Sequence, residues 1–264
     1  GFTGGNDSRV SLESMRIVYV EEYSDAPVQL TTPTDFQVAN GSNISWVSNG
    51  SQVEYSLYQY GNETALETKT MSGSSLTVAN LAAGNYTIKV KAIGDGTTTL
   101  DSGYGEYSFA VTDVISYTAQ DSKDNFERVD GDTATVSEAS GAATIDVTGW
   151  FVWMAKNGVT LNLSQCPVIV VQNFTLVSGA WLSRAKSGDT MIVMKNDTNT
   201  PSTNETIFIK TWVNVDGNKI TSNTGDAANP AGTCTYKVGI GVASTGSISL
   251  TGIRIVVVSE YIAS

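Results

Sequence analysis

The sequence predicts an all-β protein made of two consecutive β-sandwiches. Apolar residues nowhere recur at the spacing of an amphipathic helix, whereas short strand-like stretches follow one another between turn-forming residues. One of these stretches occurs twice, once near each end of the 264-residue chain. Such a repeat indicates one period of a longer array.

The repeated stretch covers residues 11–23, which begin at Ser11 and end at Tyr23, and residues 249–261. Aligned without a gap, 8 of the 13 positions are identical. Both faces of the first copy are apolar, so this strand is expected to be covered on both sides. Because a bare strand of this kind would aggregate, residues 15–22 are predicted to pair, either within this chain or with a neighbouring copy that lacks its own closing strand. Residues 1–28 are therefore predicted to be the closing strand of a preceding repeat and a linker.

Residues 29–112 are predicted to form the first sandwich. Seven strands in about eighty residues are typical of a small antiparallel sandwich. They are expected at residues 35–38, 43–47, 53–60, 67–71, 75–78, 86–93 and 107–111.

Residues 81–92, with the sequence Leu-Ala-Ala-Gly-Asn-Tyr-Thr-Ile-Lys-Val-Lys-Ala, resemble the fibronectin type III pattern around its sixth strand. Trp46 fits the core tryptophan of that family. The resemblance implies a tyrosine corner, in which the ring of Tyr86 packs inside and its hydroxyl reaches the backbone near Leu81. It implies a spacer role here, because the sequence contains no Arg-Gly-Asp motif.

Residues 113–264 follow with almost no linker and are predicted to form a two-sheet jelly roll, because so many strands fit into about 150 residues. Residues 148–150, the stretch 161–167 before an apolar strand, and the closing residues 253–255 are similar to galactose-binding-like jelly rolls of the carbohydrate-binding-module type. The strands are expected at residues 115–118, 133–137, 144–148, 151–154, 159–163, 168–177, 181–184, 191–195, 206–213, 235–242 and 247–258.

Aromatic residues of the second sandwich are the candidates for binding a glycan, the partner that this resemblance implies. A sugar ring stacks on an exposed aromatic face while amides and carboxylates bind its hydroxyls. The two-residue period of a strand places Trp212 beside Lys210 and Asn214, and Trp181 lies at a strand end. These four residues are the predicted ligand-binding site, with a core position for the tryptophans as the alternative. Trp150 is expected in the core.

Composition excludes several functions. The net charge of -11 opposes binding to nucleic acid and to anionic membranes. No apolar run is long enough for membrane insertion. Histidine is absent, and no pair of carboxylates is singled out for glycoside hydrolysis, so no enzyme is predicted. The abundance of Ser, Thr, Gly and Asn favours an extracellular or cell-surface location.

A metal site and a disulfide stay open at this point. Asp121, Asp124, Asp130 and Asp132 offer the oxygen ligands that calcium prefers, so they either hold a structural calcium or are solvated turn residues. No other cofactor is predicted. The two cysteines, Cys166 and Cys234, either form a bridge or are two small buried residues.

Two functional hypotheses follow. The first is a non-catalytic extracellular surface protein whose jelly roll binds glycan and whose fibronectin-like domain is a spacer. The second is a structural or adhesive repeat unit, such as a cell-surface or phage decoration or fibre protein, which assembles through its sandwiches and through residues 11–23. An exposed aromatic platform would favour the first hypothesis, and the repeated strand favours the second.

Overall fold

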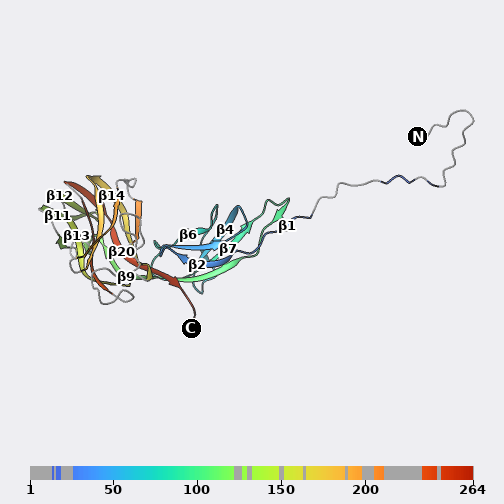
Figure 1. The fold of residues 1–264 in the computed structure, drawn as a ribbon, viewed down its shortest axis with the longest axis horizontal. Helices are drawn as coiled ribbons and strands as arrows, with labels where there is room; N and C mark the ends of the chain where they lie inside the picture. The colour runs from blue at the N-terminus through green and yellow to red at the C-terminus, as the bar shows by residue number, and fades with distance from the viewer. Residues whose placement is uncertain are drawn as a thin grey trace, which may run out of the picture.

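The computed structural model describes residues 14, 16–18, 26–121, 127–129, 133–148, 152–162, 165–187, 190–197, 205–210, 234–242 and 245–263. Over these residues the chain is almost entirely β, and its strands form two sandwiches that lie end to end (Figure 1). The predicted all-β class is confirmed. No helix in the described part of the chain is long and apolar enough to cross a membrane.

The first sandwich consists of two antiparallel sheets. One sheet has the strand order β2-β3-β6, and the other has the order β5-β4-β7-β9 and continues into the second sandwich. A short parallel pair, β1 and β8, lies at the end remote from the second sandwich (Figure 1). The strands are β1 (Val28–Gln29), β2 (Thr34–Ala39), β3 (Asn43–Val47), β4 (Gln52–Gln59), β5 (Ala65–Met71), β6 (Ser75–Thr77), β7 (Gly84–Ile93), β8 (Thr99–Leu100) and β9 (Gly105–Thr118).

The core of the first sandwich follows from strand alternation and from the aromatic residues. In β7 every second residue from Tyr86 to Ala92 is buried. Trp46 is buried against Phe36, which confirms its expected core position. The Tyr86 ring stacks on Phe109 with the ring centroids 5.6 Å apart, and its hydroxyl donates to the Ala82 carbonyl at 2.9 Å. The predicted tyrosine-corner geometry is thus confirmed, one residue from the expected Leu81.

The second sandwich packs a five-stranded sheet, of order β10-β13-β18-β15-β16, against the remaining strands of the larger sheet. Those strands have the order β11-β12-β19-β14-β20-β9, and β17 pairs with β14 off this path. The strands are β10 (Glu127–Val129), β11 (Thr133–Ala139), β12 (Ala142–Thr148), β13 (Val152–Leu161), β14 (Val168–Ser178), β15 (Trp181–Ser187), β16 (Thr190–Asp197), β17 (Glu205–Lys210), β18 (Cys234–Val242), β19 (Gly246–Leu250) and β20 (Gly252–Glu260).

Several strand boundaries differ from those expected. The stretches predicted at 151–154 and 159–163 form the single strand β13, whose register shifts between Lys156 and Val159. Gly158 lies there with a φ of 73°, a conformation that lets the extra residue bulge out without ending the strand. Conversely, the strand predicted at 247–258 is divided into β19 and β20 at Thr251.

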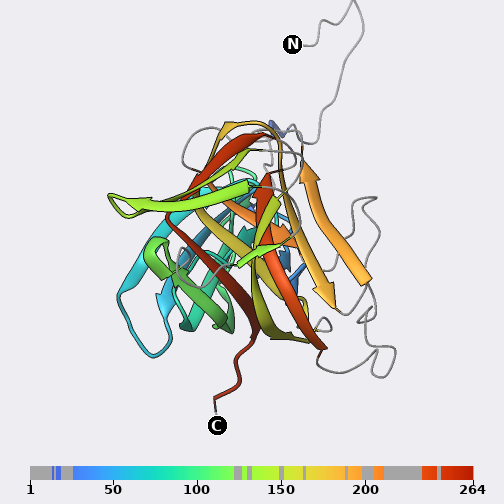
Figure 2. The same ribbon diagram turned by 90° about the vertical axis from the view of Figure 1, so that its left-hand side faces the viewer.

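Three strands, β9, β14 and β20, contribute to both hydrophobic cores. In β20, Ile253 and Ile255 face the core of the second sandwich, whereas Val256 and Val258 face that of the first. β14 alternates in the same way along Val168 to Val171. Figure 2, viewed from the side of the second sandwich, shows the dark red β20 among these strands and leading to the C-terminal end.

β9 reaches both cores through a bulge. Phe109 lies in the first core and Ile115 packs on the second, although strict alternation would place both on the same face. Ile115 pairs with Ile255 and Asp113 with Val256, so Val114 is an extra residue on β9, and it inverts the alternation beyond it. The predicted domain boundary between residues 112 and 113 therefore lies inside a continuous strand.

The first copy of the repeated stretch is described only in part. Ser14 and residues 16–18 are not in a strand. Ile17 is 89% exposed and Val18 is 58% exposed. For residues 16–18, the alternative of pairing within this chain is therefore wrong, and the alternative of pairing with another copy stays a prediction.

Candidate ligand-binding site

Of the four residues predicted to bind sugar on the second sandwich, only Trp181 has a described side chain. Trp181 is fully buried, and its ring lies 5.0 Å from that of Phe174, centroid to centroid. Its strand β15 lies between β16 and β18, and its side chain packs in the second core, so its predicted exposure is wrong. Lys210 ends β17 opposite Val168, but its side chain is outside the described part of the structure. Trp212 and Asn214, like Trp150, are outside the described residues, so this part of the site stays a prediction.

The predicted calcium ligands are described at one position only. Asp124, Asp130 and Asp132 lie outside the described residues. Asp121 is exposed and accepts a hydrogen bond from the Thr118 hydroxyl at 2.7 Å, which holds the pKa of its carboxyl below its usual value. Among the described residues, no group of three or more His, Cys, Asp or Glu side chains is placed to hold a metal. Calcium stays a prediction.

Cys166 is a half-buried free thiol just before β14. The side chain of Cys234 lies outside the described residues.

A groove that the sequence did not predict lies at the far end of the first sandwich. It has a volume of about 420 Å³ and is formed by the turn before β4, the end of β7 and the turn before β8. We call it the end groove. It is lined by Leu30, Asn49, Gly50, Ser51, Gln52, Ile93, Gly94, Asp95 and Thr99.

Asp95 fixes one wall of the end groove. One carboxylate oxygen accepts hydrogen bonds from three successive backbone amides, those of Thr97, Thr98 and Thr99, at 2.7–2.8 Å. The Thr98 hydroxyl donates to the other oxygen. These bonds, that of the Thr98 hydroxyl first, hold the pKa of Asp95 well below its usual range. The wall is therefore a preformed, negatively charged turn.

Tyr104, which is not among the lining residues of the end groove, lies at the centre of a charged network. It is 46% exposed, and its hydroxyl donates to Glu54 at 2.5 Å. The Lys91 Nζ lies 5.6 Å from the centroid of the tyrosine ring, and it forms ion pairs with Glu54 at 3.4 Å and Asp101 at 3.2 Å. The bond to Glu54 raises the pKa of Tyr104, and the contact with Asp101 raises the pKa of Lys91. The ring is thus held in one orientation with part of its surface open.

Strand register connects this network to the groove. Gln52 of β4 pairs with Ile93 of β7, and both line the groove. Two residues further along, Glu54 pairs with Lys91 on the same face of the sheet. Asp101 also accepts a hydrogen bond from the Gly94 amide at 3.0 Å, which joins it to the groove lining.

The position of Tyr104 follows from its two flanking glycines. A Cβ at Gly105 would lie 2.2 Å from the Pro33 carbonyl oxygen and 2.8 Å from the Phe36 ring, so only glycine fits there. The first core is filled at this point by Phe36 stacking on Tyr107. An aromatic residue between two glycines is the sequence signal by which this position could have been found.

A second groove lies at the junction of the two sandwiches. It has a volume of about 280 Å³ and is lined by apolar residues and by the side chains of Asn40, Gln165, Cys166 and Ser259. No exposed aromatic residue is among its lining residues. The end groove has no aromatic lining residue either, but Asp101 and Lys91 join its lining to the exposed Tyr104.

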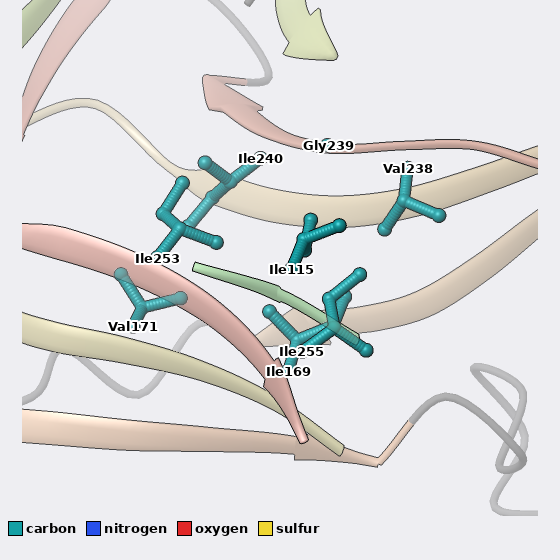
Figure 3. A pocket seen from close by; sticks show the side chains of 8 residues that line it. All are labelled: Ile115, Ile169, Val171, Val238, Gly239, Ile240, Ile253 and Ile255. Atoms are coloured by element: carbon teal, nitrogen blue, oxygen red, sulfur yellow. The ribbon is translucent and has the colours of Figure 1, made fainter. Parts of the chain in front are cut away.

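A third hollow lies inside the second core, between β9, β14, β18 and β20 (Figure 3). Its lining side chains point toward one another, and they are all isoleucine or valine apart from Gly239. It leaves about 10 Å³ for the centre of a water-sized sphere, so it is a dry packing defect rather than a ligand site.

No protein-family model matches the chain, and the search of curated proteins gave no match. Among solved structures, the chain is similar to a low-affinity xylan-binding module, CBM86, from the xylanolytic gut symbiont Roseburia intestinalis. The two are 17% identical, the alignment covers 53% of this chain and 92% of that chain, and the TM-score is 0.31. Membership of the fibronectin type III family stays a prediction from the sequence.

Proposed function

We propose that this protein is a non-catalytic glycan-binding protein of the cell exterior, and that the end groove with Tyr104 holds the sugar. Carbohydrate recognition requires an aromatic face for the apolar side of the ring, and amides, hydroxyls or carboxylates for its hydroxyls. The end groove supplies Asn49, Gln52, Ser51 and Asp95, and the half-exposed ring of Tyr104 is joined to its lining through Lys91 and Asp101. This juxtaposition is the observation that carries the proposal.

The charges of the site select a neutral glycan. Lys91, the cation that contacts the ring, is already paired with Glu54 and Asp101. Asp95 adds a negative charge to the groove wall, and the whole chain carries a net charge of -11. An anionic polysaccharide would be repelled, whereas the hydroxyls of a neutral one can donate to these carboxylates.

Affinity electrophoresis of the full chain in gels that contain xylan, galactan or β-glucan tests the proposal. We expect retardation by at least one of these neutral polysaccharides, and Tyr104→Ala should weaken binding about tenfold or more, the loss expected of one stacking ring. Tyr60→Ala is the matched control. Tyr60 is a tyrosine of similar exposure, 41%, and follows the opposite end of β4. Its substitution should leave binding unchanged.

Trp212→Ala tests the other candidate position. Loss of retardation in Trp212→Ala together with normal retardation in Tyr104→Ala would move the sugar site to the second sandwich. An unretarded wild-type chain in all three gels would contradict neutral glycan binding altogether.

A structural or adhesive repeat unit is the second candidate function. The repeated strand favours it, because arrays need repetition and a sugar site does not. The exposed apolar side chains of Ile17 and Val18 favour it as well, because an apolar strand is expected to be covered by a partner.

A further inference from the structure

The surroundings of β20 show which environment the repeated stretch, residues 11–23, would need as a strand. β20 lies between β9 and β14, so both of its edges are hydrogen-bonded. Its odd-numbered positions Ile253 and Ile255 are buried in one core, and its even-numbered positions Val256 and Val258 in the other. Any strand that replaces it must therefore be apolar on both faces.

Residues 11–23 meet that requirement at each of these four positions. Ile255, Val256 and Val258 correspond to the identical residues Ile17, Val18 and Val20, and Ile253 corresponds to Met15. Two polar differences lie at exposed or half-buried positions, where Thr251 corresponds to Glu13 and Ser259 to Glu21, and a third, Ser14, corresponds to the buried Gly252.

Residues 11–23 also repeat the arginine that is buried in β20. Arg254 is 6% exposed, and its Nε and Nη2 both donate to Asp113 Oδ1, at 3.0 and 2.6 Å. A charge at such a position is unfavourable unless a carboxylate meets it. Arg16 occupies the corresponding place in an otherwise apolar stretch, so the unit that receives this strand must present a counterpart of Asp113.

In the present chain these side chains have no such environment. Arg16, Ile17 and Val18 are exposed and belong to no strand. The β20 position of this chain is filled by its own residues. The partner is therefore outside the two sandwiches of this chain.

We propose that residues 11–23 are the closing strand of a second unit built like residues 28–261, pairing there with the counterparts of β9 and β14 and placing Arg16 against the counterpart of Asp113. This deepens the second candidate function and does not depend on glycan binding. One position restricts the fit. A Cβ at Gly252 would lie 2.5 Å from the Gln172 Oε1 and 2.9 Å from the Tyr117 carbonyl oxygen, and Ser14 corresponds to this glycine. The receiving unit must leave more room there.

An extended chain tests the proposal directly. Residues 24–248 are joined in front of residue 11, so that residues 11–23 follow residue 248 as the closing strand of the added unit. The extended chain carries Ser14→Gly, because the added unit keeps Gln172 and Tyr117 and has no room for a Cβ there. In this extended chain, Arg16→Glu should lower the unfolding midpoint of the added unit by about 5 °C or more. In the original chain the same substitution should leave the midpoint unchanged, because Arg16 is exposed there. Equal behaviour of Arg16→Glu in the two chains would overturn the proposal.

A strand replacement within the original chain keeps the test independent of the extended chain. Thr251→Glu, Ile253→Met, Val257→Tyr and Ser259→Glu together give β20 the sequence of residues 11–23 while keeping Gly252. We expect cooperative unfolding with a midpoint within about 5 °C of the wild type. The matched control places the sequence of residues 12–24 at positions 249–261, a slip of one residue that exchanges the two faces, and should abolish cooperative unfolding. A replacement that behaves like the slipped control would contradict the proposal. Glycan binding through Tyr104 is measured separately, so the two proposals can fail independently.

Discussion

Ile255 and Val256 are consecutive residues of β20, yet they are buried in different hydrophobic cores. The two sandwiches are therefore joined by a strand that belongs to both cores rather than by a flexible linker. A strand that is hydrogen-bonded on both edges and packed on both faces cannot leave one core without disturbing the other.

This relationship predicts that the two sandwiches unfold together. Ile255→Ala removes side-chain atoms from the second core only, and truncations of this kind cost about 2–5 kcal/mol of the free energy of unfolding. We expect one calorimetric transition at a lower temperature, with equal loss of amide-exchange protection in β4 and in β18. Leu66→Ala, at a 56% exposed position of β5, is the control and should change neither. Loss of protection confined to β18 would show that the sandwiches are energetically independent.

The ion pair between Arg254 and Asp113 predicts an asymmetric response to substitution. The Arg254 side chain is 7% exposed, whereas that of Asp113 is 26% exposed and can be hydrated without its partner. Asp113→Ala should therefore cost about 3–5 kcal/mol, because it leaves a buried unpaired charge. Arg254→Met keeps the packing and should cost less, about 1 kcal/mol. Denaturant titration of both variants measures the order of these costs, and the reverse order would contradict this account.

The contact between Tyr55 and Glu67 predicts two pH-dependent contributions to stability. The Tyr55 hydroxyl donates to the Glu67 Oε1 at 2.8 Å, and burial, followed by this bond, raises the pKa of Tyr55 to about 12. Because the folded state keeps the proton, this contribution is complete below pH 10 and is lost as the pH rises to about 12. The bonds from Lys69 and then Tyr55 lower the pKa of Glu67, so its contribution is present above the ordinary pKa of 4.5 and is lost on acidification.

Tyr55→Phe separates these contributions from those of the other tyrosines. The difference in unfolding free energy between wild type and variant should shrink between about pH 10 and 12. In the variant, the pKa of Glu67, measured by NMR titration, should rise toward its ordinary value because one hydrogen bond is lost. An unchanged Glu67 titration would show that Lys69 alone sets this pKa.

The sequence by itself determined the features that depend on local pattern. Two-residue alternation predicted the all-β class and most of the strands, and the resemblance of residues 81–92 to the fibronectin type III pattern predicted a bond from the Tyr86 hydroxyl to the nearby backbone. The resemblance between residues 11–23 and 249–261 is likewise a property of the sequence alone. Each of these depends on residues that are close in the chain.

Only the tertiary structure decided which faces are covered and which distant segments meet. Alternation showed that the faces of a strand differ, but it did not show that Trp181 packs on Phe174 inside the second core. The single extra residue Val114 inverts β9 and joins the two cores, and this bulge is defined only by pairing with β20. The end groove arises in the same way, because the turns before β4 and β8 come together only after β4 and β7 have paired. Register and packing between distant segments, rather than local preference, place these residues.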